Sequence, residues 1–153
     1  MTLPVVVPDA SVLLKWVLES EDEQSRDRAL ELREVWLAGK CSLVAPSLWA
    51  FEVGNVVGMR QPDLARDLIQ ILIDYRIEEE PISTFCAAAL DLMRRFKVTF
   101  YNASYHAVAL SRGGQLVTAD TGYCRKASAA GHVIDLAGWS PSLLITSSHE
   151  PSE

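Results

Sequence analysis

The stretch VVVPDAS at residues 5–11 decides the fold that we expect. Three consecutive β-branched residues without polar alternation are typical of a short strand buried on both faces, as in parallel sheets. Pro8 ends the run, and Asp9 can cap a helix over residues 10–18. The stretch therefore predicts a buried strand that is followed at once by a helix.

The alternation of apolar runs with helical patterns continues along the chain. Further apolar runs occupy residues 43–45, 115–119 and 132–136. The other expected helices cover residues 21–37, 47–60, 63–76, 85–97, 102–112 and 121–130, with expected caps at Ser20, Ser47, Asp63 and either Ser83 or Thr84. Short strands that alternate with helices predict an α/β fold in which a parallel sheet is covered on both faces, with right-handed crossovers.

The length of 153 residues and the hydrophobic content of 49% predict one globular domain, which we place at residues 1–138. A chain of this size can bury roughly two-thirds of its unfolded surface without disulfides. Residues 139–153 are rich in Ser, Pro and Thr, so we expect a flexible C-terminal tail there. The three cysteines are far apart and lack metal-binding spacing, which indicates buried free thiols in a reducing compartment.

Hydropathy and charge argue against two classes of protein. The apolar stretch at residues 3–18 is interrupted by Pro8, Asp9 and Lys15 and has no basic leader, so we expect no signal peptide, no membrane span and a cytoplasmic location. The net charge of −6 argues against a nucleic-acid binder that relies on a bulk positive field. Any contact with RNA or DNA would need a local basic patch or a bound metal.

Carboxylates stand where an open α/β sheet binds its ligands, beyond the carboxyl ends of the strands. Asp9 follows VVVP and Asp120 follows LVTA, so both should lie at one edge of the sheet. Glu52 has apolar neighbours on the helix predicted from Ser47, where an unpaired carboxylate is costly. A hard cation such as Mg²⁺ or Mn²⁺ would be the most favourable partner for carboxylates held together. We therefore predict an acidic metal site.

Each acid also has a purely structural explanation. Asp9 and Asp120 could each be present simply to cap a helix, and Glu52 could form a structural ion pair with an arginine. Their combination in one small α/β domain favours the metal site over three unrelated structural roles.

Four segments of the chain together resemble the PIN domain family, and in particular the VapC-type toxins of prokaryotic toxin–antitoxin pairs. The segments are VVVPDAS around Asp9, APSLWAFEVGNVV with Glu52, TFYNASYHAVAL around Asn102 and LVTADTGY with Asp120. The likeness extends from Val5 to about Leu136. It implies a three-layer α/β/α sandwich and a ribonuclease that uses Mg²⁺ or Mn²⁺ to hydrolyse RNA. It also implies a homodimer and a cognate antitoxin partner.

The resemblance further implies which residues form the site. By position, the catalytic and metal-binding set is Asp9, Glu52, Asn102 and Asp120, and the supporting hydroxyl residues are Ser11 and Thr118. At the position of Asn102 the family normally has aspartate, in a pattern like TFYDASYHA. Asparagine removes one negative charge but keeps a carbonyl oxygen that can contact a metal or a bound water. Fewer anionic ligands should weaken divalent-ion binding, so we expect weakened or absent hydrolysis.

Asn102 leaves several explanations open. It can be a natural variant with reduced activity, or an inactivating substitution introduced so that a toxic enzyme could be produced. It can also simply cap its helix. The alternative function is therefore a catalytically silent PIN fold that binds its antitoxin or RNA.

Histidine and basic residues near the acids are weaker candidates. His106 follows Asn102 by four residues on the same helix face and could act as a general base, although a packed helix histidine is the commoner role. Arg112, Arg125 and Lys126 flank Asp120 in the sequence and are candidate RNA contacts, but cations are also ordinary at helix C-termini.

Two other α/β families use strand-end aspartates and fit less well. A phosphoacceptor receiver domain would need paired acids after the first strand and a lysine after a late strand, and the sequence supplies neither. A haloacid-dehalogenase phosphatase would have DxD after the first strand, where this chain has Ser11 at the third position.

Overall fold

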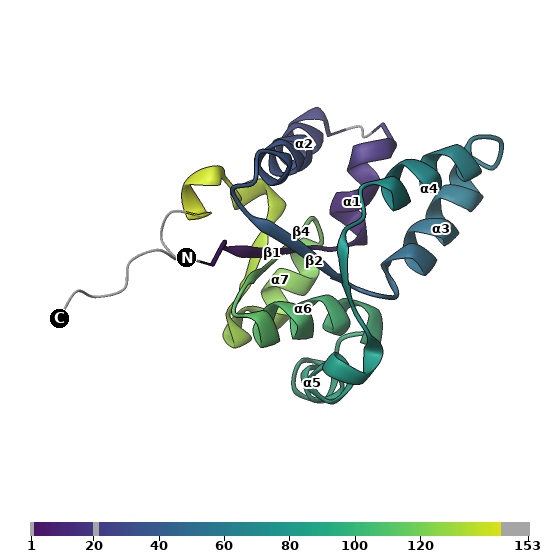
Figure 1. Cartoon of the computed structure of the whole chain (residues 1–153). Coiled ribbons are helices and arrows are strands. Elements are labelled where there is room, and N and C mark those ends of the chain that lie inside the picture. The colour runs from purple at the N-terminus through teal and green to yellow at the C-terminus, as the bar shows by residue number, and fades with distance from the viewer. Residues whose placement is uncertain (1, 20–21, 145–153) are drawn as a thin grey trace.

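Five strands form one parallel sheet in the computed structural model, which describes residues 2–19 and 22–144 (Figure 1). The strands are β1 (Val5–Pro8), β2 (Ser42–Pro46), β3 (Glu78–Glu80), β4 (Gln115–Thr118) and β5 (Val133–Asp135). The α-helices of these residues are α1 (Ala10–Val17), α2 (Glu23–Leu37), α3 (Trp49–Arg60), α4 (Ala65–Asp74), α5 (Ile82–Phe96), α6 (Phe100–Arg112) and α7 (Thr121–Ala127). The predicted parallel α/β sheet is confirmed.

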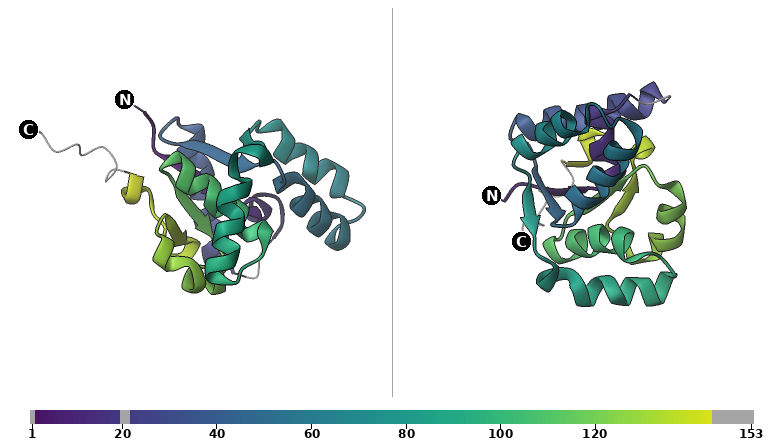
Figure 2. Two further views of the ribbon diagram at one scale, coloured as in Figure 1. Left: turned by 90° about the horizontal axis from the view of Figure 1, so that it is seen from below. Right: turned by 90° about the vertical axis from the view of Figure 1, so that its right-hand side faces the viewer.

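Helices cover both faces of the sheet. Helices α1 and α2 lie on one side and α5 and α6 on the other, while α3 and α4 project as a pair beyond the carboxyl ends of the strands (Figures 1 and 2). Helix α6 packs directly on β1, β2 and β4, and α5 packs on the outside of α6. The expected three-layer α/β/α sandwich is therefore present.

The strand order β3-β2-β1-β4-β5 places a topological switch point between β1 and β4. The chain moves outward from β1 through β2 to β3, then crosses back to β4 on the other side of β1. Pro8 of β1 pairs with Val117 of β4, and the Asp9 backbone N–H donates to the Val117 carbonyl at 3.2 Å. Ligands of open α/β sheets bind at such a point, because the flanking loops diverge there.

Apolar burial explains why these short strands hold together. Val6 and Val7 of β1 and Leu116 and Val117 of β4 are at most 1% exposed, which fits strands covered on both faces. A second cluster joins the helices around Trp16. The centroid of the Trp16 ring lies 6.1 Å from that of Trp36 and 5.4 Å from that of Tyr75. Aromatic contacts therefore join α1, α2 and the end of α4.

Three predicted helix caps are wrong, and for Ser47 the reason is pairing with a distant strand. The Ser47 N–H donates to the Glu80 carbonyl at 2.9 Å, so contact with β3 continues past β2 and α3 begins only at Trp49. Asp63 lies in a turn before α4, which begins at Ala65. Neither Ser83 nor Thr84 caps α5, since both lie within its first turn.

The predicted cap Ser20 lies outside the described residues, and Asp22 caps α2 instead through a bond from the Ser25 N–H at 3.1 Å. The three cysteines are free thiols, as expected. Of them only Cys41 is buried, whereas Cys86 and Cys124 are partly exposed.

The packed part of the chain extends to Leu144. Trp139, which we assigned to the tail, is 2% exposed, and its carbonyl accepts a bond from Arg28 Nη1 at 2.7 Å. A short 3-10 helix, Pro141–Leu144, follows it. The remainder of the expected tail, residues 145–153, lies outside the described residues. Within the described residues no helix is long and apolar enough to cross a membrane.

Gly114 provides a direct test of the β1–β4 junction. A Cβ at this position would lie 2.5 Å from the Val5 carbonyl oxygen, so Gly114→Ala must push the two strands apart. We expect a loss of about 1–3 kcal/mol in the free energy of unfolding. The melting temperature should fall by about 2–4 °C for each kcal/mol in a chain of this size.

Gly58→Ala is the matched control, because a Cβ there meets nothing within 4 Å and the position is helical. It should raise the free energy of unfolding by up to about 1 kcal/mol. Equal melting temperatures for the two variants would contradict the close contact between β1 and β4.

Candidate active site

Asp9 is buried at the end of β1 and caps α1. It is 7% exposed, and its carboxylate accepts hydrogen bonds from the Ser11 hydroxyl, the Thr118 hydroxyl and the Val12 N–H, the last at 3.3 Å. Burial raises the pKa of Asp9, and these hydrogen bonds oppose the rise. The cap and the predicted site position therefore belong to the same carboxylate.

Ser11 and Thr118 connect Asp9 to the segment that follows β4. The Ser11 Oγ accepts from the Ala119 N–H, and the Thr118 Oγ1 accepts from the Asp120 N–H, both at 3.0 Å. Because each hydroxyl donates its hydrogen to Asp9, each can also accept from the backbone. This chain of bonds fixes the start of α7 next to Asp9. The two hydroxyls that the resemblance indicated thus lie beside the first acid.

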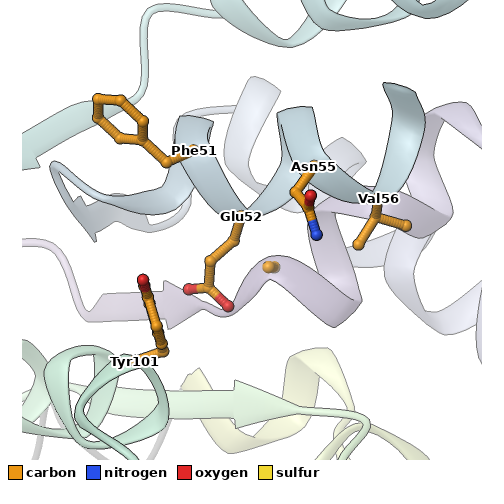
Figure 3. A pocket seen from close by; sticks show the side chains of 6 residues that line it. Phe51, Glu52, Asn55, Val56 and Tyr101 are labelled. Atoms are coloured by element: carbon orange, nitrogen blue, oxygen red, sulfur yellow. The ribbon is translucent and has the colours of Figure 1, made fainter. Parts of the chain in front are cut away.

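Glu52 lies in the first turn of α3 and points toward the sheet (Figure 3). Its Oε1 atom is buried and has no hydrogen-bond partner among the described residues, and the same holds for the Tyr105 hydroxyl. Burial raises the pKa of Glu52, the Tyr105 hydroxyl opposes this rise as a hydrogen-bonding neighbour that lacks the geometry of a direct bond, and the charge of Asp9 adds to the rise. Burial, together with the charges of Glu52 and Asp9, also raises the pKa of Tyr105.

An orphaned buried carboxylate oxygen is costly unless a cation or a proton reaches it. Hard divalent cations take carboxylate oxygens as ligands, and Glu52 and Asp9 both supply them. These two carboxylates therefore have the donor chemistry of a divalent-cation site, but by themselves they are only part of a ligand set.

Asn102 and Asp120 face a second pocket, of about 170 Å³, between α6 and α7. Asp120 is exposed and caps α7 through a bond from the Tyr123 N–H at 3.0 Å. The suggestion that Asn102 caps its own helix is wrong, because Thr99 is the cap and its Oγ1 accepts from the Asn102 N–H at 3.3 Å. The Asn102 side chain instead lines the pocket beside Asp120.

The predicted set is therefore divided between two pockets. A pocket of about 360 Å³ beside Glu52 is lined by Ala10, Phe51, Glu52, Asn55, Val56 and Tyr101 (Figure 3). Asp9 lies enclosed at the switch point, and Asp120 and Asn102 face the second pocket. Among the described residues no three His, Cys, Asp or Glu side chains are grouped closely enough to hold a metal ion. Asn102 carries no charge, so it adds no acid to the pocket that it shares with Asp120.

The three basic candidates do not form one patch. Arg112 pairs with Glu78 at 3.4 Å and with Glu80 at the outer strand β3, so its charge is already used in the fold. It flanks Asp120 in the sequence, but β4 separates the two in space. Lys126 lines the pocket of Asn102 and Asp120, and Arg125 is exposed outside that lining.

His106 is a structural residue. It is 0% exposed, and its ring nitrogens contact the Tyr123 hydroxyl and the Gly131 carbonyl, each at 2.7 Å. A carbonyl can only accept, so Nε2 carries the hydrogen and Nδ1 accepts from Tyr123. Burial lowers the pKa of His106. With both nitrogens occupied, it is not a general base, and it positions Tyr123 beside Asp120 instead.

Sequence reasoning missed two residues of the site. Tyr105 faces Glu52, and Tyr123 lines the second pocket together with Lys97. Tyr105 carried a signal, since it lies one helical turn after Asn102. Lys97 carried one as well, because it stands at the basic end of a predicted helix. Tyr123 carried none, because only the approach of α5 to α7 brings it to the pocket.

The family model for the PIN domain matches residues 6–129. The sequence matches none of the curated proteins. Among solved structures, VapC20 from Mycobacterium tuberculosis, a Sarcin-Ricin loop cleaving toxin, has a TM-score of 0.59 at 18% identity, covering 84% of this chain and 96% of its own.

PAE2754 from Pyrobaculum aerophilum has a TM-score of 0.57 at 22% identity, covering 95% of this chain and 97% of its own. FitAB bound to an IR36 DNA fragment has a TM-score of 0.55 at 14% identity, and the match covers 88% of this chain and 97% of its own. These three likenesses concern the fold.

The burial of the Glu52 carboxylate should make the stability of the chain depend on pH. Burial raises the pKa of Glu52 in the folded chain, so its penalty is absent below about pH 4 and grows as the pH rises through the folded value. In EDTA, Glu52→Gln should therefore raise the melting temperature by a few degrees at pH 7, and the gain should vanish toward pH 4. Thermal unfolding across this pH range measures both effects.

Glu31→Gln on α2 is the control, because Glu31 is exposed and should show no such trend. A Glu52→Gln variant that is less stable than the natural chain at pH 7 would show that the buried carboxylate is compensated, contrary to this description.

Proposed function

Since the chain belongs to the PIN domain family, we propose that it is a VapC-type ribonuclease toxin whose hydrolysis of RNA phosphodiester bonds depends on Mg²⁺ or Mn²⁺. The family membership supports nuclease activity in general, and the fold shared with the toxin VapC20 supports the toxin type. Among the described residues, the observation that carries the proposal is the half-buried Glu52, whose enclosed Oε1 makes no direct hydrogen bond and whose charge lies near the buried Asp9.

Four side chains would hold the metal: Asp9, Glu52, Asn102 and Asp120. The ion would lower the pKa of bound water and offset negative charge on the phosphate. Ser11 and Thr118 hold the Asp9 carboxylate in one orientation, and Thr118 also fixes the Asp120 backbone. Tyr105 restricts the solvent around Glu52, since both are largely buried.

Lys126 and Lys97 would bind RNA phosphate next to Asp120. Both line the pocket that Asn102 and Asp120 share, and they are its two cationic lining residues. A local pair of cations suits a chain whose net charge of −6 cannot attract RNA through a bulk field. Arg112 has no part in this proposal because it is paired with Glu78 and Glu80.

The second candidate function is a silent PIN fold that binds its antitoxin or RNA without cleaving. Asn102 favours it, since it leaves three acids where the resemblance indicates four. Under both candidates we propose a cognate antitoxin, a homodimer and a cytoplasmic location. Exposed apolar side chains on α3, α4 and α5 support the protein contacts, among them Met59 at 79%, Ile71 at 47% and Leu90 at 53%.

Restoring the acid tests the two candidates against each other. Asn102→Asp should increase Mn²⁺-dependent cleavage of total RNA by roughly tenfold or more, because one further anionic ligand strengthens metal binding. Expression of this variant should slow growth. Cleavage assays with Mn²⁺ and with EDTA measure the enzyme directly, and calorimetry with Mn²⁺ measures the metal.

Asp9→Ala in the Asn102→Asp background should abolish the gain. The nuclease proposal fails if the restored chain binds Mn²⁺ yet cuts no RNA and does not slow growth.

Lys126→Ala in the Asn102→Asp background should raise the KM for RNA several-fold and reduce the salt dependence of binding by about one phosphate contact. The matched control is Arg125→Ala on the same helix, because Arg125 is exposed and lies outside the pocket lining. Equal KM values for the two variants would contradict the proposed phosphate contact.

A further inference from the structure

The pocket beside Glu52 has two walls of different chemistry. Phe51, Val56 and Tyr101 supply apolar surface, and Glu52 and Asn55 supply the polar groups. Tyr101 rises from α6 toward α3 with its hydroxyl pointing into the space, while the Phe51 ring projects away from Glu52 and forms the rim (Figure 3). The pocket is thus framed by aromatic rings from two helices that are far apart in the sequence.

Both rings are available to a ligand. Phe51 is 80% exposed and Tyr101 is 55% exposed, although α3 and α6 have large buried faces. Single exposed aromatic residues are ordinary, but two that line one hollow next to a buried acidic site are not explained by packing. Each ring directly precedes a site residue in the chain, Phe51 before Glu52 and Tyr101 before Asn102.

Asn55 adds a polar group that can read the edge of a flat ligand. It lies three residues after Glu52, so both side chains extend from the same face of α3 (Figure 3). A carboxamide both donates and accepts hydrogen bonds, which matches the mixed edge of a nucleobase. The lining contains no lysine or arginine, so this pocket is unsuited to a phosphate.

From these observations we infer that the Phe51–Asn55–Tyr101 pocket binds an unpaired nucleobase of the RNA, next to the phosphate held on the Asp120 side. Phe51 and Tyr101 stack on the base, and Asn55 contacts its edge. Single-stranded RNA is bound by stacking of splayed bases on aromatic side chains, whereas paired bases present no free face. The volume of about 360 Å³ is ample for one base. This inference rests on the proposed function, since it assumes that RNA is the substrate.

The positions of the two pockets suggest how an RNA strand would lie across the site. The aromatic pocket lies on the α3 side of Asp9, and the two lysines lie on the α7 side. An RNA strand that spans both places its backbone over the acids. We therefore expect selectivity for loops and single strands over duplex RNA.

Binding without hydrolysis tests the pocket directly. The probe is a single-stranded RNA of about 12 nucleotides and mixed sequence, with one central 2-aminopurine, in buffer with EDTA. Tyr101→Ala and Phe51→Ala should each weaken binding by about 5- to 20-fold and restore 2-aminopurine emission, because a stacking surface is lost. Fluorescence anisotropy gives the affinity, and the emission reports stacking.

Two controls separate stacking from other effects. Tyr101→Phe keeps the ring, and Leu37→Ala removes an apolar side chain that is 56% exposed at the end of α2, outside the pocket. Both should stay within about twofold of the natural affinity. Asn55→Ala should change the relative affinity for oligo(A), oligo(C) and oligo(U) more than the mean affinity. The same RNA annealed to its complement should bind more weakly and respond to none of the substitutions.

Cleavage in the Asn102→Asp background separates failure of the inference from failure of the proposed function. With Mn²⁺, Tyr101→Ala should raise KM and leave kcat nearly unchanged. If Tyr101→Ala changes neither the KM nor the affinity for RNA while cleavage stays normal, the base pocket is wrong and the proposed nuclease activity is retained. The base pocket is also wrong if Tyr101→Ala weakens binding of the antitoxin but not binding of RNA. If no variant binds or cuts RNA, both proposals fail.

Discussion

The buried Asp9 carboxylate at the junction of β1 and β4 is the constraint on which the site depends. It caps α1, accepts from Ser11 and Thr118, and through those hydroxyls holds the backbone of Ala119 and Asp120. A charged group with low exposure is costly in isolation, and these bonds offset part of that cost. The carboxylate therefore joins the two central strands and orients the loop that carries the last acid.

The acidic site combines structural and functional roles in the same residues. Asp9 and Asp120 are both helix caps, and their position beyond parallel strands also places them at the switch point of the sheet. Glu52 differs, because its buried Oε1 makes no direct hydrogen bond within the described residues, and the Tyr105 hydroxyl only partly offsets its burial. A bound cation would offset the remaining cost. Under the proposed function, the pocket lined by Phe51 and Tyr101 would bind a base of the RNA and the pocket lined by Lys97 and Lys126 its phosphate.

Expectations from the sequence failed where neighbours in the chain are separated in space. Arg112 precedes Asp120 by eight positions, yet β4 lies between them and Arg112 pairs with β3. His106 shares a helix face with Asn102, but that position is enclosed by Tyr123 and the Gly131 carbonyl. Ser47 was expected to begin a helix and instead continues the contact with β3. In each case a long-range contact overrode a sound local preference.

The sequence alone determined the alternation of buried strands and helices, the parallel sheet and the strand-end positions of Asp9 and Asp120, because hydrophobic periodicity and strand ends are local properties. Motif resemblance also predicted supporting roles for Ser11 and Thr118 and a site position for Asn102. Only the tertiary structure decided that Glu52 is orphaned beside Tyr105, that Lys97 and Lys126 share a pocket with Asp120, and that Phe51 and Tyr101 frame another. Burial and pocket walls depend on which helices meet across the sheet, and that information is not contained in any single segment.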